Sequence, residues 1–367
     1  MLRVESIGAR RDKPVYPFEP GVSMSNTPKA DHTVDVAIIG AGPAGLFAVF
    51  ECGMLKLSCH VIDALDDVGG QLSALYPEKP IYDIPGLPKI LAADLVHQLE
   101  DQVAPFEPVF HLGQQVTGLS EGADGRWKLE TSKGTSIDAG SVIIAAGVGA
   151  FGPNRPPLEG IEAFEGAGPG EGIHYMVKRR EDFRGKHVVI AGGGDSAVDW
   201  ALSLSDVAES LAIVHRRPKF RAAPDSAEKL KQLSDAGAIE LVVPYQLAGL
   251  EGDDGRLEAV LVADLDGNQR RLPADVLLPF YGLSQNIGPI AEWGLGLENN
   301  HITVDAASMS TSRSGIFAVG DIIHYPGKLK LILTGFAEAA LAAHSARAHL
   351  HPGEVLHFEY STTQGVP

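Results

Sequence analysis

The sequence has very little cysteine. Only Cys52 and Cys59 occur among 367 residues, which is too few for the disulfide framework of a small secreted domain. Free cysteines in proteins of a reducing compartment are most often simply buried. We therefore expect two unreactive thiols and no redox pair.

Positive charge and long apolar segments are also scarce. The chain has 30 Lys and Arg against 47 Asp and Glu, a formal net charge of -17. Nucleic acids and anionic membranes need a dense positive surface, so neither is an expected partner. No segment is apolar for long enough to cross a membrane, and residues 1–20 lack the apolar core of a secretion signal. A cytoplasmic location is the expectation.

Glycine and apolar residues are plentiful. The sequence has 42 glycines and 44% hydrophobic residues, which indicates a globular α/β protein with many tight turns. Its length allows two domains with full cores. Residues 1–32 contain four prolines among polar residues, so we expect an N-terminal extension that is disordered or packs on a neighbour.

Two glycine-rich turns have the form of dinucleotide-binding fingerprints. The first, GAGPAG, covers residues 40–45, and the second, GGGDSA, covers residues 192–197. Each follows an apolar β-branched run and precedes a helix-like apolar pattern, the order that brings backbone N–H groups to a pyrophosphate. We therefore predict two bound nucleotides with electron transfer between them. The predicted contacts are Gly40, Gly42, Ala44 and Gly45 in the first turn and Gly192, Gly194, Asp195 and Ser196 in the second.

Asp63 ends the second predicted strand of the first unit, 23 positions after Gly40. A carboxylate there accepts hydrogen bonds from both ribose hydroxyls and repels a 2′-phosphate. The first unit is therefore expected to hold the adenosine of FAD or NAD. The alternative is a solvated aspartate at a strand end.

The second unit has arginines where the first has its carboxylate. The strand at 211–214 ends in His215, Arg216 and Arg217, and Arg221 follows closely. Guanidinium groups offer forked donors to a 2′-phosphate, so NADPH is favoured over NADH. The alternative is an exposed basic turn.

The order of elements predicts a discontinuous first domain. Residues 152–157 hold three prolines, which break any regular element. After a second unit at 152–284, we expect the strand and turn of 315–321 and the apolar helix of about 331–350 to belong with the first. We therefore assign residues 33–151 and 285–367 to one domain and residues 152–284 to another inserted into it.

The string GIFAVGD at 315–321 resembles the late FAD motif of the flavoprotein disulfide reductase superfamily, and the domain order resembles that of low-molecular-weight thioredoxin reductases. The resemblance implies that Asp321 binds the ribityl chain of FAD. The alternative is an ordinary turn cap. Thioredoxin reductases carry a Cys-x-x-Cys pair shortly before the second fingerprint, whereas residues 172–180 here contain no cysteine. Without that nucleophile, thioredoxin reduction is excluded.

Three strings together are similar to thioredoxin-reductase-type ferredoxin–NADP reductases. They are GGQLSALYPEK at 69–79, GGGDSAVDWAL at 192–202 and YSTT at 360–363. The resemblance covers residues 33–367. It implies an α/β fold of two Rossmann-like domains, the NADPH domain inserted into the FAD domain, and a homodimer.

The resemblance also implies contacts with the flavin. Tyr76 stacks on one face of the ring and Tyr360 on the other, while the Thr362 hydroxyl approaches it; for either tyrosine the alternative is a buried core aromatic. The implied FAD contacts outside the first glycine turn are Asp63, Gln71, Tyr76, Val116, Phe151, Asp321 and Thr362. The NADPH contacts outside the second turn are His215, Arg216, Arg217 and Arg221.

The implied reaction passes hydride between NADP(H) and FAD and single electrons between FAD and ferredoxin or flavodoxin. It needs no acid–base residue, and none is assigned; no metal site is predicted. Because ferredoxins are usually acidic, docking needs a local basic patch. The candidate residues are Lys178, Arg179, Arg180, Arg184 and Lys186, or Lys328 and Lys330, and the alternative is a merely solvated charged face.

Other functions stay open. The acceptor could be a quinone, a ferric complex or oxygen, and the least favoured is a protein disulfide reached through a bound small thiol. A flavin-binding regulatory protein without turnover is the alternative of a different class. The intact second fingerprint and Arg216–Arg217 argue against it.

Overall fold

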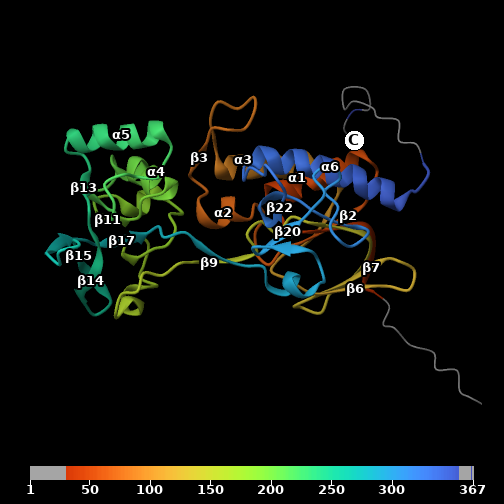
Figure 1. Cartoon of the computed structure of the whole chain (residues 1–367), viewed down its shortest axis with the longest axis horizontal. Helices are drawn as coiled ribbons and strands as arrows, with labels where there is room; N and C mark the ends of the chain where they lie inside the picture. Colours follow the sequence, from red (N-terminus) through yellow and green to blue (C-terminus); the bar gives the residue numbers. More distant parts are fainter. Residues whose placement is uncertain (1–29, 355–364, 366–367) are drawn as a thin grey trace, which may run out of the picture.

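The computed structural model of the chain describes residues 30–354 and residue 365, without the side chains of residues 150–151 and 283–285. Figure 1 shows two lobes joined by a narrow connection that contains β9. We call the larger lobe the first domain and the smaller lobe the second domain. The first domain contains chain segments from before and after the second domain. The predicted fold class is confirmed.

The core of the first domain is a seven-stranded sheet in the order β5-β2-β1-β8-β7-β6, with β21 paired in parallel to β8. Val36, Ala37 and Ile38 of β1 are fully buried, as expected for an apolar strand between two parallel neighbours. Since β21 lies far along the chain, the C-terminal part returns to the first sheet. The strands are β1 (His32–Ile39), β2 (Cys59–Ile62), β5 (Val109–His111), β6 (Val116–Glu121), β7 (Trp127–Thr131), β8 (Ser136–Ile144) and β21 (Ile316–Ala318).

Three long helices lie together over this sheet (Figure 1): α1 (Pro43–Met54), α3 (Ala92–Val103) and α6 (Ile332–Leu350). α1 packs against both α3 and α6, and its small residues Gly45 and Ala48 are buried. The shorter elements are α2 (Gln71–Leu75), β3 (Pro80–Ile81), β4 (Ile90–Leu91), η1 (Ala104–Phe106), η4 (Gly288–Glu292), β19 (Leu297–Glu298), β20 (His301–Thr303), η5 (Gly320–Ile322) and β22 (Ile323–His324).

The second domain repeats this plan on a smaller scale. Its parallel sheet runs β10-β17-β11-β12-β13, and an antiparallel sheet β14-β15-β16 packs beside it. The parallel sheet forms one apolar cluster with the helices and a separate apolar cluster with the small antiparallel sheet. The elements are η2 (Ile161–Phe164), β10 (Gly172–Ile173), η3 (Arg180–Phe183), β11 (His187–Ala191), α4 (Asp195–Leu204), β12 (Ser210–Val214), α5 (Pro224–Asp235), β13 (Glu240–Val242), β14 (Gln246–Asp253), β15 (Arg256–Ala263), β16 (Gln269–Pro273) and β17 (Val276–Pro279).

Two antiparallel strands connect the domains. β9 (Ala150–Pro153) pairs with β18 (Leu283–Asn286). The predicted boundaries at 151/152 and 284/285 fall within this strand pair. Within the part of the chain that the structure describes, no helix is long and apolar enough to cross a membrane.

A buried histidine pair lies between β2 and β5. His60 Nδ1 is 2.9 Å from His111 Nε2, and the two residues are 9% and 8% exposed. Burial, followed by the charge of His111, lowers the pKa of His60 to about 4, and burial also lowers the pKa of His111. Both imidazoles are therefore neutral in the folded chain at pH 7.

We expect this pair to make the fold acid-sensitive between pH 6.5 and 4. In that window the unfolded chain protonates both imidazoles, whereas the folded chain keeps His60 neutral down to about pH 4 and protonates His111 less readily, so the free energy of unfolding falls as pH falls. Each proton of difference corresponds to about 1.4 kcal/mol per pH unit. Urea unfolding at pH 7 and pH 5 should show a smaller loss for His60→Gln than for the wild type. An equal loss would assign the acid sensitivity to other groups.

Candidate functional site

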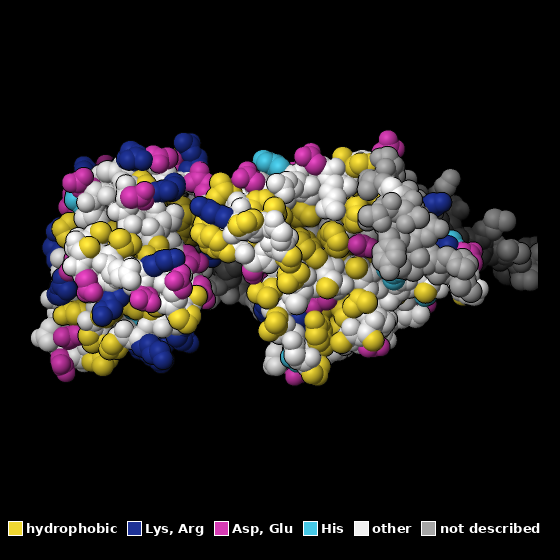
Figure 2. Space-filling view, turned by 90° about the horizontal axis from the view of Figure 1, so that it is seen from above, with side chains coloured by type: hydrophobic (Ala, Val, Ile, Leu, Met, Phe, Trp, Pro, Cys, Tyr) yellow, Lys and Arg dark blue, Asp and Glu magenta, His cyan; other side chains and the backbone are white. Residues whose placement is uncertain are grey.

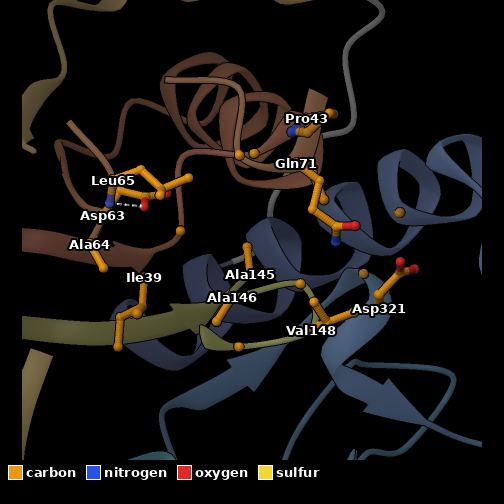
Figure 3. Close-up of a pocket in the computed structure, with 18 of the residues that line it drawn as sticks. Ile39, Pro43, Asp63, Ala64, Leu65, Gln71, Ala145, Ala146, Val148 and Asp321 are labelled. Atoms are coloured by element: carbon orange, nitrogen blue, oxygen red, sulfur yellow. Dashed lines mark hydrogen bonds between the residues drawn. The ribbon is translucent and has the colours of Figure 1, made fainter. Parts of the chain in front are cut away.

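A cavity of about 440 Å³ opens at the carboxyl ends of β1, β2 and β8. In parallel α/β sheets this edge is where ligands bind. Figure 3 shows its walls, with Ile39 and Ala145 at the strand ends, Asp63 on one side and Gln71 and Asp321 on the other. Predicted contacts from both parts of the first domain therefore meet at one cavity.

The first glycine turn is as tight as its fingerprint requires. Gly40 has φ +113°, and a Cβ there would lie 2.3 Å from the carbonyl oxygen of Ala145. A Cβ on Gly45 would lie 1.9 Å from the carbonyl oxygen of Gly40. This close crossing brings the first turn of α1, which begins at Pro43, to the cavity. Proline suits that position because the first N–H groups of a helix have no partner within it.

Gly45→Ala should destabilise the fold by about 2 kcal/mol or more, since the new methyl group meets backbone atoms that cannot move aside cheaply. Gly168→Ala is the matched control, because a Cβ on Gly168 meets nothing within 4 Å; its effect should stay within about 0.5 kcal/mol. Urea unfolding measures both. Equal effects would mean that α1 shifts to accept the methyl group.

Asp63 directly follows β2 and caps the glycine turn. Its Oδ2 accepts a hydrogen bond from the Ala41 N–H at 2.6 Å, and its Oδ1 accepts one from the Leu65 N–H at 2.8 Å. Burial raises the pKa of Asp63, and the backbone donors partly oppose that rise. The carboxylate is thus fixed at the cavity wall beside the turn (Figure 3).

Tyr76 and Asp321 lie at the other end of the cavity. Asp321 belongs to η5, just after β21. Burial, with a smaller contribution from the Asp321 carboxylate, raises the pKa of Tyr76 to about 12. The phenol therefore stays neutral, and its ring lines the cavity.

Most of the predicted contacts of the first site line this cavity. They are Gly40, Gly42, Ala44, Asp63, Gln71, Tyr76, Val116 and Asp321. Gly45 supports the turn from behind. The side chain of Phe151 is not described, and Tyr360 and Thr362 lie outside the described residues. Their predicted roles stay predictions.

Some of the cavity wall carries no sequence motif. Ile287, Pro289 and Trp293 follow the linker strand β18, and Lys330, Leu331 and Ile332 precede or begin α6. No spacing rule marks these residues, because they reach the cavity through the return of the chain to the first sheet. Only the predicted domain order indicated that the chain after β18 belongs to the first domain.

The second glycine turn lies at the end of β11. Gly192 has φ +155°, and a Cβ there would lie 2.7 Å from the carbonyl oxygen of Phe280. Gly194 precedes α4, and the Asp195 Oδ1 accepts a hydrogen bond from the Ala223 N–H at 2.9 Å. The Arg221 N–H donates to the carbonyl oxygen of Gly193 at 2.7 Å. Hydrogen bonds therefore join the glycine turn to the basic segment that follows β12.

His215 lies beneath this turn. A Cβ on Gly193 would lie 2.3 Å from the imidazole ring, which also packs against Phe220 with ring centroids 5.3 Å apart. Its Nε2 is buried, and no hydrogen-bond partner exists for it among the described residues. Burial, then the charges of Arg216, Arg221 and Arg217, lower the pKa of His215. The cluster of guanidinium charges beside the turn fits an anionic ligand.

The predicted basic patch is largely neutralised on the second domain. Figure 2 shows basic and acidic side chains interspersed over its surface. The ion pairs are Arg179–Asp182 at 3.8 Å, Arg180–Asp206 at 2.5 Å, Arg184–Glu181 at 2.7 Å and Lys186–Glu171 at 3.4 Å. In contrast, Arg216, Arg217 and Arg221 form no salt bridge with the described carboxylates.

The prediction that Lys328 contributes to a docking surface is wrong. Its side chain is 3% exposed, and its Nζ lies 2.6 Å from Glu338 Oε1. A lysine paired with a buried carboxylate cannot meet an external partner. Lys330 lines the cavity of the first domain.

The segment without cysteine, residues 172–180, contributes Ile173 and Val177 to the core of the second domain. Val177 is fully buried there, close to Phe183. Cys52 and Cys59 are free and buried, as expected for unreactive thiols.

Comparisons with known proteins agree with this geometry. The family model described as pyridine nucleotide-disulphide oxidoreductase matches residues 34–345. The chain is 66% identical over 338 residues to a ferredoxin–NADP reductase of Paramagnetospirillum magneticum, covering 92% of this chain and 99% of that protein. It is 64% identical over 336 residues to one of Rhodospirillum rubrum, covering 91% and 96%. A crystal structure of thioredoxin reductase from Lactococcus lactis superposes with a TM-score of 0.73 at 25% identity, covering 86% of this chain and 99% of that one.

Proposed function

The chain belongs to the pyridine nucleotide-disulphide oxidoreductase family, and from that premise we propose that it is an FAD-dependent ferredoxin–NADP reductase. The observation that carries the proposal is the pair of unlike glycine turns. One turn is capped by the half-buried carboxylate of Asp63, and beside the other lies a cluster of arginines around His215, whose Nε2 has no partner among the described residues. Relatives at 66% and 64% identity carry the same activity in their names.

The residues of the first domain fit FAD. Asp63 is fixed where the adenosine ribose of a dinucleotide lies, and the N-terminus of α1 faces the pyrophosphate position. Asp321 is placed to hold the ribityl chain, and the neutral ring of Tyr76 offers a flat apolar surface to the flavin. When bound, FAD accepts a hydride from NADPH and releases electrons one at a time.

The residues of the second domain fit NADPH. The N-terminus of α4 receives the pyrophosphate, while Arg216, Arg217 and Arg221 hold the 2′-phosphate near His215. The protein's part in the reaction is to bind, orient and shield the two nucleotides. The hydride step needs no proton-carrying side chain, because a hydride would leave one nucleotide and arrive at the other; the proton left when both electrons pass to a one-electron acceptor would be released to solvent.

The electron partner is a ferredoxin, with flavodoxin as a further partner of the same kind. We propose a homodimer in the cytoplasm. The ion pairs on the second domain argue against a docking site made only of Arg180, Arg184 and Lys186. The roles of Phe151, Tyr360 and Thr362 at the flavin belong to the proposal as well.

Anaerobic reduction of the purified protein by NADPH and by NADH tests the proposal. We expect NADPH, but not NADH, to bleach the flavin rapidly. Ferredoxin should then stimulate the reduction of cytochrome c in the same cuvette. Bleaching without stimulation by ferredoxin would leave an NADPH-dependent flavoenzyme with another acceptor. No bleaching by either nucleotide would favour a protein without turnover.

A further inference from the structure

One short segment of the first domain makes polar contact with the second domain. The Glu78 Oε2 accepts a hydrogen bond from the Arg180 N–H at 2.7 Å. Lys79 Nζ lies 2.8 Å from Asp199 Oδ2 on α4. Tyr76, three residues before Lys79, packs against the apolar clusters of both domains. Figure 1 shows α2 and β3, which flank this segment, facing α4.

This segment completes the GGQLSALYPEK motif, whose last residues the flavin site does not use. Gln71 and Tyr76 line the cavity, whereas Glu78 and Lys79 do not. Lys79 Nζ also lies 5.7 Å from the centre of the Tyr76 ring. The motif thus has one part that faces the flavin cavity and one part that contacts the other domain.

The partner of Lys79 is close to the second nucleotide turn. Asp199 lies about one helical turn after Asp195, the first residue of α4. The contact therefore links the helix that carries the second glycine turn to the tyrosine that lines the first cavity. Lys79 and Asp199 side chains are 28% and 30% exposed, so the pair is accessible enough to break without unfolding either domain.

We infer that Glu78 and Lys79 are positioning residues that fix the orientation of the second domain relative to the flavin cavity. The inference rests on the proposed function. Domains joined by a short linker move relative to one another by default unless a large hydrophobic interface holds them, and here the linker is the β9–β18 pair. A few specific contacts are then enough to select one orientation among several of similar free energy.

Distances between spin labels on the two domains test the inference with the full-length holoprotein. Both native cysteines are buried, so labels attach selectively to the introduced cysteines Gln98→Cys on α3 and Lys231→Cys on α5. Labelled chains are mixed with an excess of unlabelled chains, so that distances between the protomers of the proposed dimer do not contribute, and in this background we expect one narrow distance distribution. Lys79→Glu should broaden or shift it, Glu78→Ala should do the same, and the charge exchange Lys79→Glu with Asp199→Lys should restore it. Arg270→Glu is the control, because it breaks the Arg270–Glu240 pair inside the second domain.

Flavin reduction at saturating NADPH is the second measurement. Lys79→Glu should change the limiting rate at least threefold while the Kd for NADP+ stays within twofold, and the charge exchange should return the rate toward that of the wild type. An unchanged distance distribution in both Lys79→Glu and Glu78→Ala, or equal broadening in Arg270→Glu, would overturn the inference. If NADPH does not reduce even the wild type, the proposed function fails, and the label distances still decide whether the contact sets the orientation.

Discussion

Glu338→Ala is expected to cost about 3–5 kcal/mol of stability and to weaken FAD binding. The Glu338 carboxylate is 2% exposed and accepts three hydrogen bonds, from the Gly320 N–H at 2.8 Å, the Tyr325 hydroxyl at 2.8 Å and Lys328 Nζ at 2.6 Å. Removing it leaves a buried ammonium without a partner, and breaking a buried ion pair on one side costs about that much. Urea unfolding and retention of flavin absorbance after gel filtration measure the two effects.

The expected loss of FAD follows from the positions of the residues that donate hydrogen bonds to Glu338. Gly320 precedes Asp321, and both line the flavin cavity together with Lys330 and Leu331. By binding the Gly320 amide and Lys328 at once, Glu338 ties the turn after β21 to the segment that leads into α6. Without it, the two parts of the wall are no longer fixed to each other, so we expect Asp321 to lose its position beside the proposed ribityl site.

A more exposed ion pair in the same domain is the control that distinguishes the effect of burial from the effect of losing an ion pair. Arg126 and Asp138 form a salt bridge whose side chains are 32% and 33% exposed, so Asp138→Asn should cost about 1 kcal/mol or less and leave FAD bound. Lys328→Met combined with Glu338→Met should recover part of the stability, because no unpaired charge remains. A loss for Glu338→Ala as small as that for Asp138→Asn would mean that water replaces the carboxylate.

The sequence was sufficient to predict features that depend on neighbours along the chain. The strand, glycine turn and helix around Gly40 follow from local spacing, and so does Asp63 at the end of the next strand. The buried state of Lys328 was not predictable in this way, because a lysine is solvated unless a partner is present. That partner, Glu338, is ten residues away and is brought close only when α6 packs on the sheet.

Contacts between the domains escaped prediction for the same reason. Glu78 reads as an ordinary surface carboxylate, and its donor, the Arg180 N–H, lies 102 positions further along the chain. The wall residues Ile287 and Trp293 reach the cavity because the chain returns to the first domain after it has formed the second domain. The parts that escaped are therefore the ones that depend on packing between distant segments.

Replacing Arg216 and Arg217 together with alanine is expected to lower kcat/KM for NADPH by about 10²-fold or more. A hydrogen bond to a charged group is worth about 1.5–3 kcal/mol, and each 1.4 kcal/mol corresponds to a factor of ten. NADH lacks the 2′-phosphate, so its kcat/KM should change by only a few fold. Steady-state kinetics with both nucleotides measure the difference.

Arg184→Ala is the control for this variant, because Arg184 is exposed but already paired with Glu181 and lies outside the second glycine turn. It should change the kinetics with either nucleotide by less than about twofold, as expected for a surface ion pair. An equal fall for NADPH and NADH in the double variant would show that the two arginines support the turn rather than hold the phosphate.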